Sequence, residues 1–374
     1  MTTANANALT ARWAATLDGD GTVLSGAGAY VLLALLGPFA AGAARDELLA
    51  VAPTPLGLPG SPATRMAAAV WSRSEVPLTE EFAAAVPEHL RGKLTGDPAV
   101  DQPELDAWAA AQTDGEIPAM PIRVGAETLM VLASALLVQT AWADRFEDGV
   151  QRPRSGPWAE RELAGLHRRG RGAAALSALR VVDGADGPLT LLTVAGEADV
   201  DVVLALGGAE LPASVVLPAA IAGLGADGTV TVERGPGVSV REIEAVDDEP
   251  ELVVSTVRFR VSASHDLLAH AEVFGLRAAT DTGTGHFPGM SPVPLAVSQA
   301  RQDAVAEFTA TGFKAAAVTG IAMRLAGAFF PQLDKRKQVT SVVFDRPFGF
   351  LAVHRPTGLV LVAGWVGEAQ PFRG

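Results

Sequence analysis

The sequence contains no cysteine. The chain therefore forms no disulfide, uses no thiolate nucleophile, and lacks the ligands of cysteine-containing zinc sites. Lysine is also rare, with four residues among the 29 basic ones, and this preference for arginine is typical of a GC-rich genome. Charged residues make up only 19% of the chain, whereas hydrophobic residues make up 49%, so a sizeable apolar core can form.

Positive charge is in short supply, because the formal net charge is −13. Nucleic acid and anionic membrane surfaces are therefore poor partners for the molecule as a whole. Residues 26–44 carry no charge before Arg45, but Pro38 interrupts the run and Ala and Gly fill half of it. We expect a buried core helix here and not a membrane span. Residues 1–7 have neither a basic region nor an apolar core, so we expect no secretory leader and a cytoplasmic location.

Helical spacing dominates the first third of the chain, and strand-like patterns dominate the rest, which predicts the α+β class. No linker, repeat or low-complexity tract divides the sequence, so we expect one domain over 1–374. Helices are predicted over 8–18, 43–51, 79–94, 103–112 and 266–274, and strands over 66–72, 189–194, 200–206, 215–217 and 252–261. The apolar run over 128–142 is expected to end a helix or loop and lead into a buried strand.

The C-terminal segment has the strongest pattern. Two apolar runs flank Arg355, Pro356, Thr357 and Gly358, which predicts a buried hairpin. The preceding run Phe344-Asp-Arg-Pro-Phe348 resembles the C-terminal signature of the serpins, a family of serine protease inhibitors. Upstream, Gly312-Phe-Lys-Ala-Ala-Ala-Val-Thr319 resembles the hinge of the loop that serpins offer to a protease.

Further matches to serpins follow in the expected order along nearly the whole chain. They are Leu24-Ser25, Gly42, Glu47–Leu49, Leu105–Trp108, Thr113, Gly115, Ile117, Thr128–Leu136, Trp142, Phe146, Val257–Phe259, Asp266-Leu267, Phe274–Leu276, Phe287–Ser291, Val297-Ser298, Ala304 and Glu307. The resemblance, to a divergent bacterial-type member, implies the serpin fold: three β-sheets, eight to nine helices, and an exposed reactive-centre loop over about 309–343. It also implies a metastable native state, in which cleavage lets the loop insert as a new strand in the main sheet.

An inserted strand alternates its faces. Counted from Gly312, the inward set is Phe313, Ala315, Ala317 and Thr319, and the outward set is Lys314, Ala316 and Val318. Phe313 departs from the small residue that inhibitory serpins carry, and overpacking a core costs about 1–3 kcal/mol. The acidic pair that usually precedes the hinge glycine is replaced by Ala310 and Thr311.

The resemblance also identifies the region that opens to admit the strand. The gate, or shutter, falls on Ser25, Ser134 and Gln302, which can form a neutral hydrogen-bonded cluster or serve only as structural polar packing. Gly26 and Gly28 stand where the family has proline and serine. Trp142 matches the tryptophan at the upper opening, the breach.

Family spacing places the scissile bond at Ala326-Gly327, which suits an elastase- or subtilisin-like protease. Leu325-Ala326 is the neighbouring alternative, and Arg324 or Lys335–Lys337 would attract trypsin-like enzymes. The segment from the hinge to Phe344 is about ten residues longer than usual. The extra residues, 329–339, are interpreted as a surface insertion or as an arm that recognises a partner.

Other constellations have structural explanations. Asp281-Thr282-Gly283 resembles half of an aspartic-protease motif, but the chain has no second copy. His265 and His270 lie five residues apart, a poor spacing for one helical face. The basic stretch Arg152, Arg154, Arg161, Arg168, Arg169 and Arg171 is either a polyanion site or a solvated face. We expect neither a metal nor a cofactor.

Two functions follow from the resemblance, and a third remains open. The first is a suicide inhibitor of a serine or cysteine protease. The second is a non-inhibitory serpin that binds a peptide, protein or small ligand. In the third, the fold serves as an enzyme in peptide or natural-product maturation. The first two would not be enzymes. The expected partner is a protease or a peptide or protein ligand, and the chain is expected to be a monomer.

Overall fold

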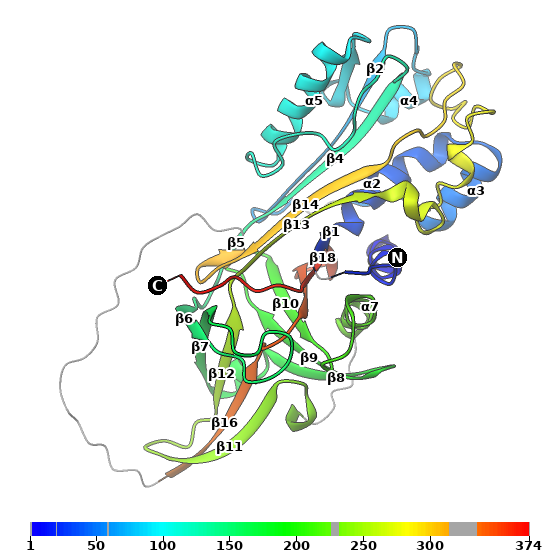
Figure 1. Ribbon diagram of the computed structural model, residues 1–374. Helices are drawn as coiled ribbons and strands as arrows, with labels where there is room; N and C mark the ends of the chain where they lie inside the picture. Colours follow the sequence, from blue (N-terminus) through cyan, green and yellow to red (C-terminus); the bar gives the residue numbers. More distant parts are fainter. Residues whose placement is uncertain (1, 20, 58–59, 226–231, 314–334, 374) are drawn as a thin grey trace.

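The computed structural model describes residues 2–19, 21–57, 60–225, 232–313 and 335–373 (Figure 1). Eight α-helices lie within these ranges, in agreement with the eight to nine expected. They are α1 (Thr2–Ala14), α2 (Gly26–Leu36), α3 (Gly42–Val51), α4 (Glu80–Ala85), α5 (Pro98–Gln112), α6 (Gly172–Leu176), α7 (Ala213–Gly223) and α8 (Ala271–Phe274). Short 3-10 turns are η1 (Gly37–Phe39), η2 (Glu88–Leu90), η3 (Val232–Arg234), η4 (Leu267–His270) and η5 (Ala278–Thr280).

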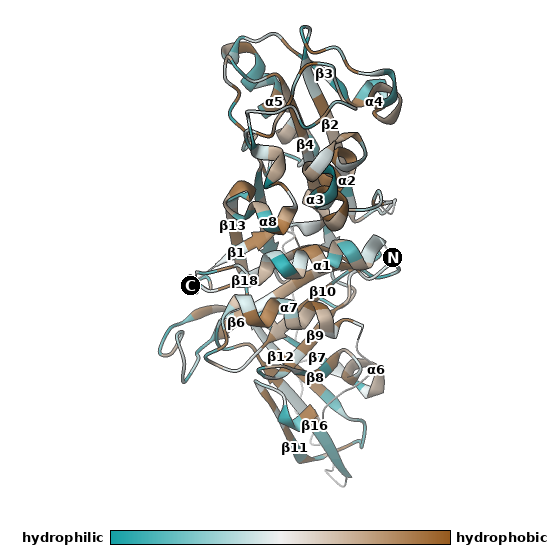
Figure 2. Cartoon of the chain, turned by 90° about the vertical axis from the view of Figure 1, so that its right-hand side faces the viewer, coloured by the Kyte–Doolittle hydropathy of each residue, from teal (hydrophilic) through white to brown (hydrophobic). Residues whose placement is uncertain are grey.

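The expected C-terminal hairpin lies at the centre of a six-stranded antiparallel sheet. In spatial order its strands are β1 (Thr22–Leu24), β18 (Leu359–Val366), β17 (Phe348–His354), β10 (Val200–Leu206), β9 (Gly187–Val194) and β8 (Leu179–Gly184). Every residue of β17 and β18 is buried. The turn between them places Gly358 at φ +68°, a conformation that glycine adopts without strain. Helices α1 and α7 pack against each other and against this sheet (Figure 2).

A five-stranded sheet forms the lower part of the molecule in the view of Figure 1. In spatial order its strands are β11 (Val238–Ala245), β16 (Lys335–Val343), β12 (Glu251–Val257), β7 (Leu163–Arg171) and β6 (Glu147–Gln151). Lys335–Val343 is therefore a strand, although the sequence placed these residues in an exposed loop over about 309–343. The sequence pattern also gave no sign of β11.

The remaining strands form two ladders that run side by side. One has the order β13 (Phe259–Asp266), β14 (Arg301–Phe308), β15 (Gly312–Phe313) and β5 (Thr140–Ala141). The other has the order β3 (Arg91–Leu94), β2 (Thr64–Arg73) and β4 (Met130–Val138). Because β4 leads into β5 along the chain, the two ladders are parts of one large sheet, parted between β4 and β14.

One strand expectation is wrong, because residues 215–217 lie in helix α7. Two helical expectations also need correction. The uncharged run over 26–44 is not one helix. α2 ends at Leu36, where Gly37 and Pro38 turn the chain into η1, and α3 begins at Gly42. The predicted helix over 79–94 ends at Ala85. Its last residues form β3, where parallel pairing with β2 overrides their helical spacing. None of the described helices is both long enough and apolar enough to cross a membrane.

Most buried side chains form one continuous core between the sheets and helices α1 and α2. A smaller apolar cluster, with Trp71, Leu105 and Met120, lies under α5 on the outer face of β2 and β4. The parted sheet thus has α2 on its inner side and α5 on its outer side.

Candidate functional site

An open groove separates β4 from β14. β4 pairs with β2 along one edge, and β14 pairs with β13 along one edge. Among the described residues no ladder joins β4 to β14, so their facing edges have unpaired stretches. Two adjoining cavities, of about 90 Å³ and about 390 Å³, lie along this line. We call this space the sheet groove.

The two cavities occupy different ends of the sheet groove. The smaller is bounded by β4, β14, Phe313, the first turns of α2, and the segment that follows α5. The larger lies beside Met130 of β4 and the segment 294–301, with Leu32, Leu33 and Leu36 of α2 beneath it. The sheet groove therefore runs the length of β4, and residues between 108 and 122 line its smaller cavity.

The two-residue strand β15 closes one end of the sheet groove. The chain reverses after β14, so that Phe313 pairs with Phe308 of β14 and with Thr140 of β5. β15 is antiparallel to both neighbours, which is the geometry of a strand that enters between two parallel ones. A Cβ on Gly312 would overlap Thr140 O and would lie 3.1 Å from Ala141 Cα, so glycine is required for this close approach.

Trp142 holds the reversal between β14 and β15. Its indole nitrogen donates to Thr309 O over 2.9 Å, and its backbone nitrogen donates to Thr311 O over 3.0 Å. The ring is fully buried, with its centroid 4.7 Å from that of Phe308. The expected breach tryptophan thus lies directly against the start of the hinge.

Phe313 is buried, with 2% of its surface exposed, and its ring centroid lies 6.1 Å from that of Phe350. The sequence led us to expect that its bulk would overpack the core. The structure instead accommodates the ring beside the smaller cavity. Ala304 and Ala306 of β14 line the same cavity.

The three expected gate residues meet at the first turn of α2. Gln302 makes two hydrogen bonds with the backbone of Ser25: its Oε1 accepts from Ser25 N at 2.7 Å, and its Nε2 donates to Ser25 O at 2.9 Å. Ser134 Oγ donates to Gly28 O at 3.0 Å from the other side of the sheet groove. Ser25 Oγ caps α2 through Gly28 N and donates to Leu361 O. These bonds tie both edges of the sheet groove to the same helix end.

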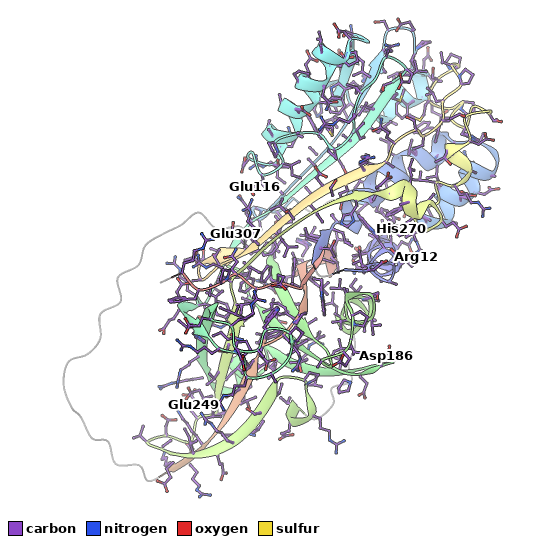
Figure 3. The ribbon with its side chains drawn as sticks, viewed as in Figure 1. Arg12, Glu116, Asp186, Glu249, His270 and Glu307 are labelled. Atoms are coloured by element: carbon purple, nitrogen blue, oxygen red, sulfur yellow. The ribbon has the colours of Figure 1, made fainter. Side chains whose placement is uncertain are left out.

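Charged groups line the outer side of β14. Arg260 of β13 bonds to Glu307 of β14 and to Glu116, which follows α5, at 2.9 Å and 3.0 Å (Figure 3). Burial disfavours the charge on Arg260, but its bonds to the two carboxylates outweigh this and raise its pKa. Near this network, Asp303 has a buried Oδ1 without a hydrogen-bond partner in the described structure. The Glu116 contact joins the segment after α5 to the edge of the sheet groove.

A serine, an aspartate and a histidine also come together away from the sheet groove. His354 Nε2 lies 3.4 Å from Asp199 Oδ2, and Ser61 Oγ donates to the other carboxylate oxygen. Burial opposes the charge on Asp199, but the hydrogen bond from Ser61 and the neighbouring His354 lower its pKa. Serine and histidine each contact the carboxylate and not each other, so the arrangement lacks the nucleophile–base contact of a catalytic triad. No sequence motif connects these three residues.

The other hinge residues and the scissile bond lie outside the described residues. These residues are Lys314, Ala315, Ala316, Ala317, Val318, Thr319, Arg324, Leu325, Ala326 and Gly327. The basic run after them belongs to β16, where each cation has an acidic partner. The pairs are Lys335–Asp248 at 3.6 Å, Arg336–Glu242 at 3.1 Å and Lys337–Glu251 at 2.7 Å. Residues 335–339 are therefore part of a sheet and not of a surface insertion.

The arginine-rich stretch is largely engaged with neighbouring groups. Arg152 pairs with Glu162, Arg161 with Glu368, and Arg169 with Glu251. Arg168 lies over the ring of Phe146, 4.8 Å from its centroid. These partners favour the interpretation of a solvated, ion-paired face.

Sequence comparison identifies one family. A model described as "Serpin (serine protease inhibitor)" matches residues 213–368, which is less than half of the chain. Serpin B6 of Pongo abelii is 31% identical over 117 residues, and Serpin B6 of Macaca fascicularis matches to the same extent. That segment is 31% of this chain and 29% of each relative, so most of the relatives' length is not matched in sequence.

Solved structures resemble the chain over nearly its full length. Native protease nexin-1 with heparin superposes with a TM-score of 0.72 at 17% identity, covering 98% of each chain. A serpin from the trematode Schistosoma haematobium gives 0.69 at 13% identity, covering 99% of this chain and 100% of its own. Thyroxine-binding globulin in complex with thyroxine gives 0.70 at 15% identity, covering 99% of both chains. The chain has the serpin fold, and the family model supports its assignment to the serpin family.

Proposed function

We propose that this protein is a suicide inhibitor of a serine or cysteine protease, acting by insertion of its cleaved loop into the sheet groove. The observation that carries the proposal is β15. This strand already pairs with both β14 and β5, while β4 and β14 remain unpaired beyond it. The intact protein thus has a started strand and an open place for the rest of it.

The register of β15 fits the residues that would follow. Thr319 is six residues after Phe313, so continued pairing brings it opposite Gln302, six before Phe308, and opposite Ser134, six before Thr140. Like Phe313, Thr319 would then face inward, toward the gate. Lys314 would face outward beside Glu307, a carboxylate that would attract its charge.

Insertion would satisfy backbone groups on two strand edges at once. Each hydrogen bond formed in a protein contributes about 0.5–1.5 kcal/mol net, so a strand paired along both edges gains many such contributions. Only cleavage would release enough chain to follow β15 along the whole of β4. The intact form would therefore be kinetically trapped, and the cleaved form would be the more stable one.

The larger cavity supports a second candidate function. Its volume, about 390 Å³, falls in the range of small-molecule sites, and apolar residues of α2 and β4 line much of it. The serpin fold carries thyroxine in the thyroxine-binding globulin complex. In this alternative the protein binds an apolar ligand, and cleavage of its loop brings no insertion.

Limited proteolysis with elastase or subtilisin distinguishes protease inhibition from ligand binding. If the proposal is right, some protease becomes trapped in a complex that survives SDS, and the nicked protein melts well above the intact one. Thr319→Arg should abolish both effects, because it would bury a charge beside Ser134 and Gln302. Val318→Arg is the matched control, since its side chain would face outward. If nicked and intact wild type have the same melting temperature and no complex forms, the inhibitor proposal is wrong and only the ligand-binding function remains.

A further inference from the structure

One rung of the five-stranded sheet carries a glutamate, a histidine and a serine side by side. His167 of β7 is the direct partner of Glu147 on β6 and of Ser255 on β12. Residues directly opposite each other in a ladder project from the same face of the sheet, with Cβ atoms about 4.5–5.5 Å apart. We call Glu147, His167 and Ser255 the Ser255 rung.

Ser255 and His167 are joined by a hydrogen bond, with 2.7 Å between Ser255 Oγ and His167 Nδ1. This separation is the one expected between a nucleophile and its general base. Both residues are half-buried, whereas Val254 and Thr256, on the opposite face of β12, are buried in the core. The hydroxyl group is therefore next to a base on the side of the sheet that a small molecule can reach.

Two glycines make room for the imidazole ring. Gly149 of β6 and Gly165 of β7 are direct partners and lie on the same face as the Ser255 rung, two residues along each strand. A Cβ on Gly149 would lie 2.7 Å from His167 Cδ2, and a Cβ on Gly165 would lie 3.0 Å from His167 Nε2. The Cδ2–Nε2 edge of the ring thus lies over the glycines, while Nδ1 is directed at Ser255. A side chain at position 149 would displace the ring.

Charged groups near the Ser255 rung suit an acyl transfer. Glu147 is exposed, and its carboxylate would balance the positive charge of the imidazolium that forms when His167 accepts a proton. Arg169, the next residue of β7 on the same face, has a 76% exposed side chain and bonds to Glu251. Backbone N–H groups of a ladder lie in the plane of the sheet, so Arg169 is the group placed to favour an oxyanion above Ser255. Because one exposed cation gives limited stabilisation, we expect reaction with activated esters and not with amides.

We propose that Ser255 and His167 form a nucleophilic dyad that accepts acyl groups from carboxylic esters with good leaving groups. Ser255 Oγ forms a bond to the carbonyl carbon while its proton passes to His167 Nδ1. The ester C–O bond then breaks, the leaving group departs with the electron pair, and the imidazolium returns its proton to the leaving group or to solvent. Water next attacks the serine ester, passing a proton through His167 to Ser255 Oγ and releasing the carboxylic acid. This activity is separate from the proposed inhibition, because it requires neither cleavage of the loop nor the sheet groove.

The dyad is tested by mixing the intact, full-length protein with p-nitrophenyl acetate, following release of p-nitrophenolate, and locating the acetyl group in acid-quenched samples by peptide mass spectrometry. We expect acetylation of Ser255, and its loss in Ser255→Ala. His167→Gln keeps a polar side chain and should slow acetylation about 100-fold or more, a usual contribution of a general base. Ser341→Ala is the matched control and should leave the rate unchanged. Ser341 lies on the same face, on β16, but its direct partners are Ser239 and Val253.

Gly149→Ala tests the geometry without altering the serine or the histidine. Its Cβ would displace the ring of His167 from Ser255, so acetylation should slow about tenfold or more. Gly57→Ala is the matched control, because a Cβ there would meet open space. Unchanged melting temperatures would show that a loss of reaction is not a loss of fold. Acetylation confined to amines, or an equal rate in the wild type and Ser255→Ala, would overturn the proposal. An equal rate in the wild type and His167→Gln would exclude His167 as the base and overturn it as well.

Discussion

Phe313→Thr removes the ring that anchors the hinge while keeping a β-branched residue suited to a strand. Phe313 has 2% of its surface exposed and packs near Phe350, yet β15 has only two residues. The ring therefore supplies most of the apolar burial that keeps β15 docked. We expect this substitution to loosen the hinge in the intact protein.

The size of the effect follows from burial. Removing a phenylalanine side chain from water contributes about 1.5–3 kcal/mol, and threonine recovers little of this. A loss of about 2 kcal/mol shifts the ratio of docked to released hinge roughly 30-fold. Because a two-residue strand can detach without unfolding the domain, global stability should change much less.

Native-state hydrogen exchange of residues 309–313 measures directly how often the hinge is released. We expect Phe313→Thr to exchange about 30-fold faster there, with the rest of the core unchanged. Phe372→Thr is the matched control, because that ring is 40% exposed. Unchanged exchange at the hinge would refute the anchoring role, and a collapse of the melting temperature would show that the ring supports the whole domain. If bulk at this position obstructed insertion instead, nicked Phe313→Thr would melt above nicked wild type.

Three further substitutions test the surroundings of the sheet groove. Gln302→Ala removes two hydrogen bonds to the backbone at the start of α2 and should lower the free energy of unfolding by about 1–3 kcal/mol in urea titrations. Gly26→Ala should cost about 1–3 kcal/mol, because the new Cβ would lie 2.8 Å from Thr10 Cα. Burial lowers the pKa of His265 below its ordinary value of 6.5. The unfolded chain then binds more protons, so stability falls as pH drops through 6.5, and His265→Gln should flatten that slope.

Each of these has an outcome that contradicts it. Gln302→Ala with wild-type stability would mean that water replaces the amide without loss. Gly26→Ala with an unchanged melting temperature would mean that α1 moves away from α2 at no cost. A pH slope that persists in His265→Gln would assign the proton uptake to another group.

Local signals were sufficient for much of the fold. The hairpin of β17 and β18 follows from two apolar runs and a turn ending in Gly358, all of which act within a few residues. The uncharged apolar run that begins at Gly26 likewise predicts α2, because a buried helix of this kind can be read from neighbouring residues. The gate residues came from a resemblance, and their hydrogen bonds to α2 required the structure.

Non-local pairing explains what the sequence missed. Lys335–Lys337 reads as a basic surface run, and only its backbone pairing with the distant β11 makes it part of a strand. In the first half of β11, exposed residues (Ser239 and Arg241) alternate with half-buried ones (Val238 and Val240). Such alternation is too weak to identify a strand from the sequence. Similarly, the burial of Phe313 depends on partners that are distant in the sequence, because it pairs with Thr140 and its ring packs near Phe350.

The two ends of the loop are held with unequal strength, and this asymmetry determines which part can move. At the N-terminal end, one ring and a two-residue ladder hold β15 at the mouth of the sheet groove. At the C-terminal end, the nine residues of β16 pair with β11 at eight positions and with β12 at five, and Lys337 forms an ion pair with Glu251 of β12. A cut between the ends would therefore free the segment that follows β15 and leave the other attached to the five-stranded sheet. A protease linked to the N-terminal side of the cut would be carried along the sheet groove, whereas one linked to the C-terminal side would stay in place.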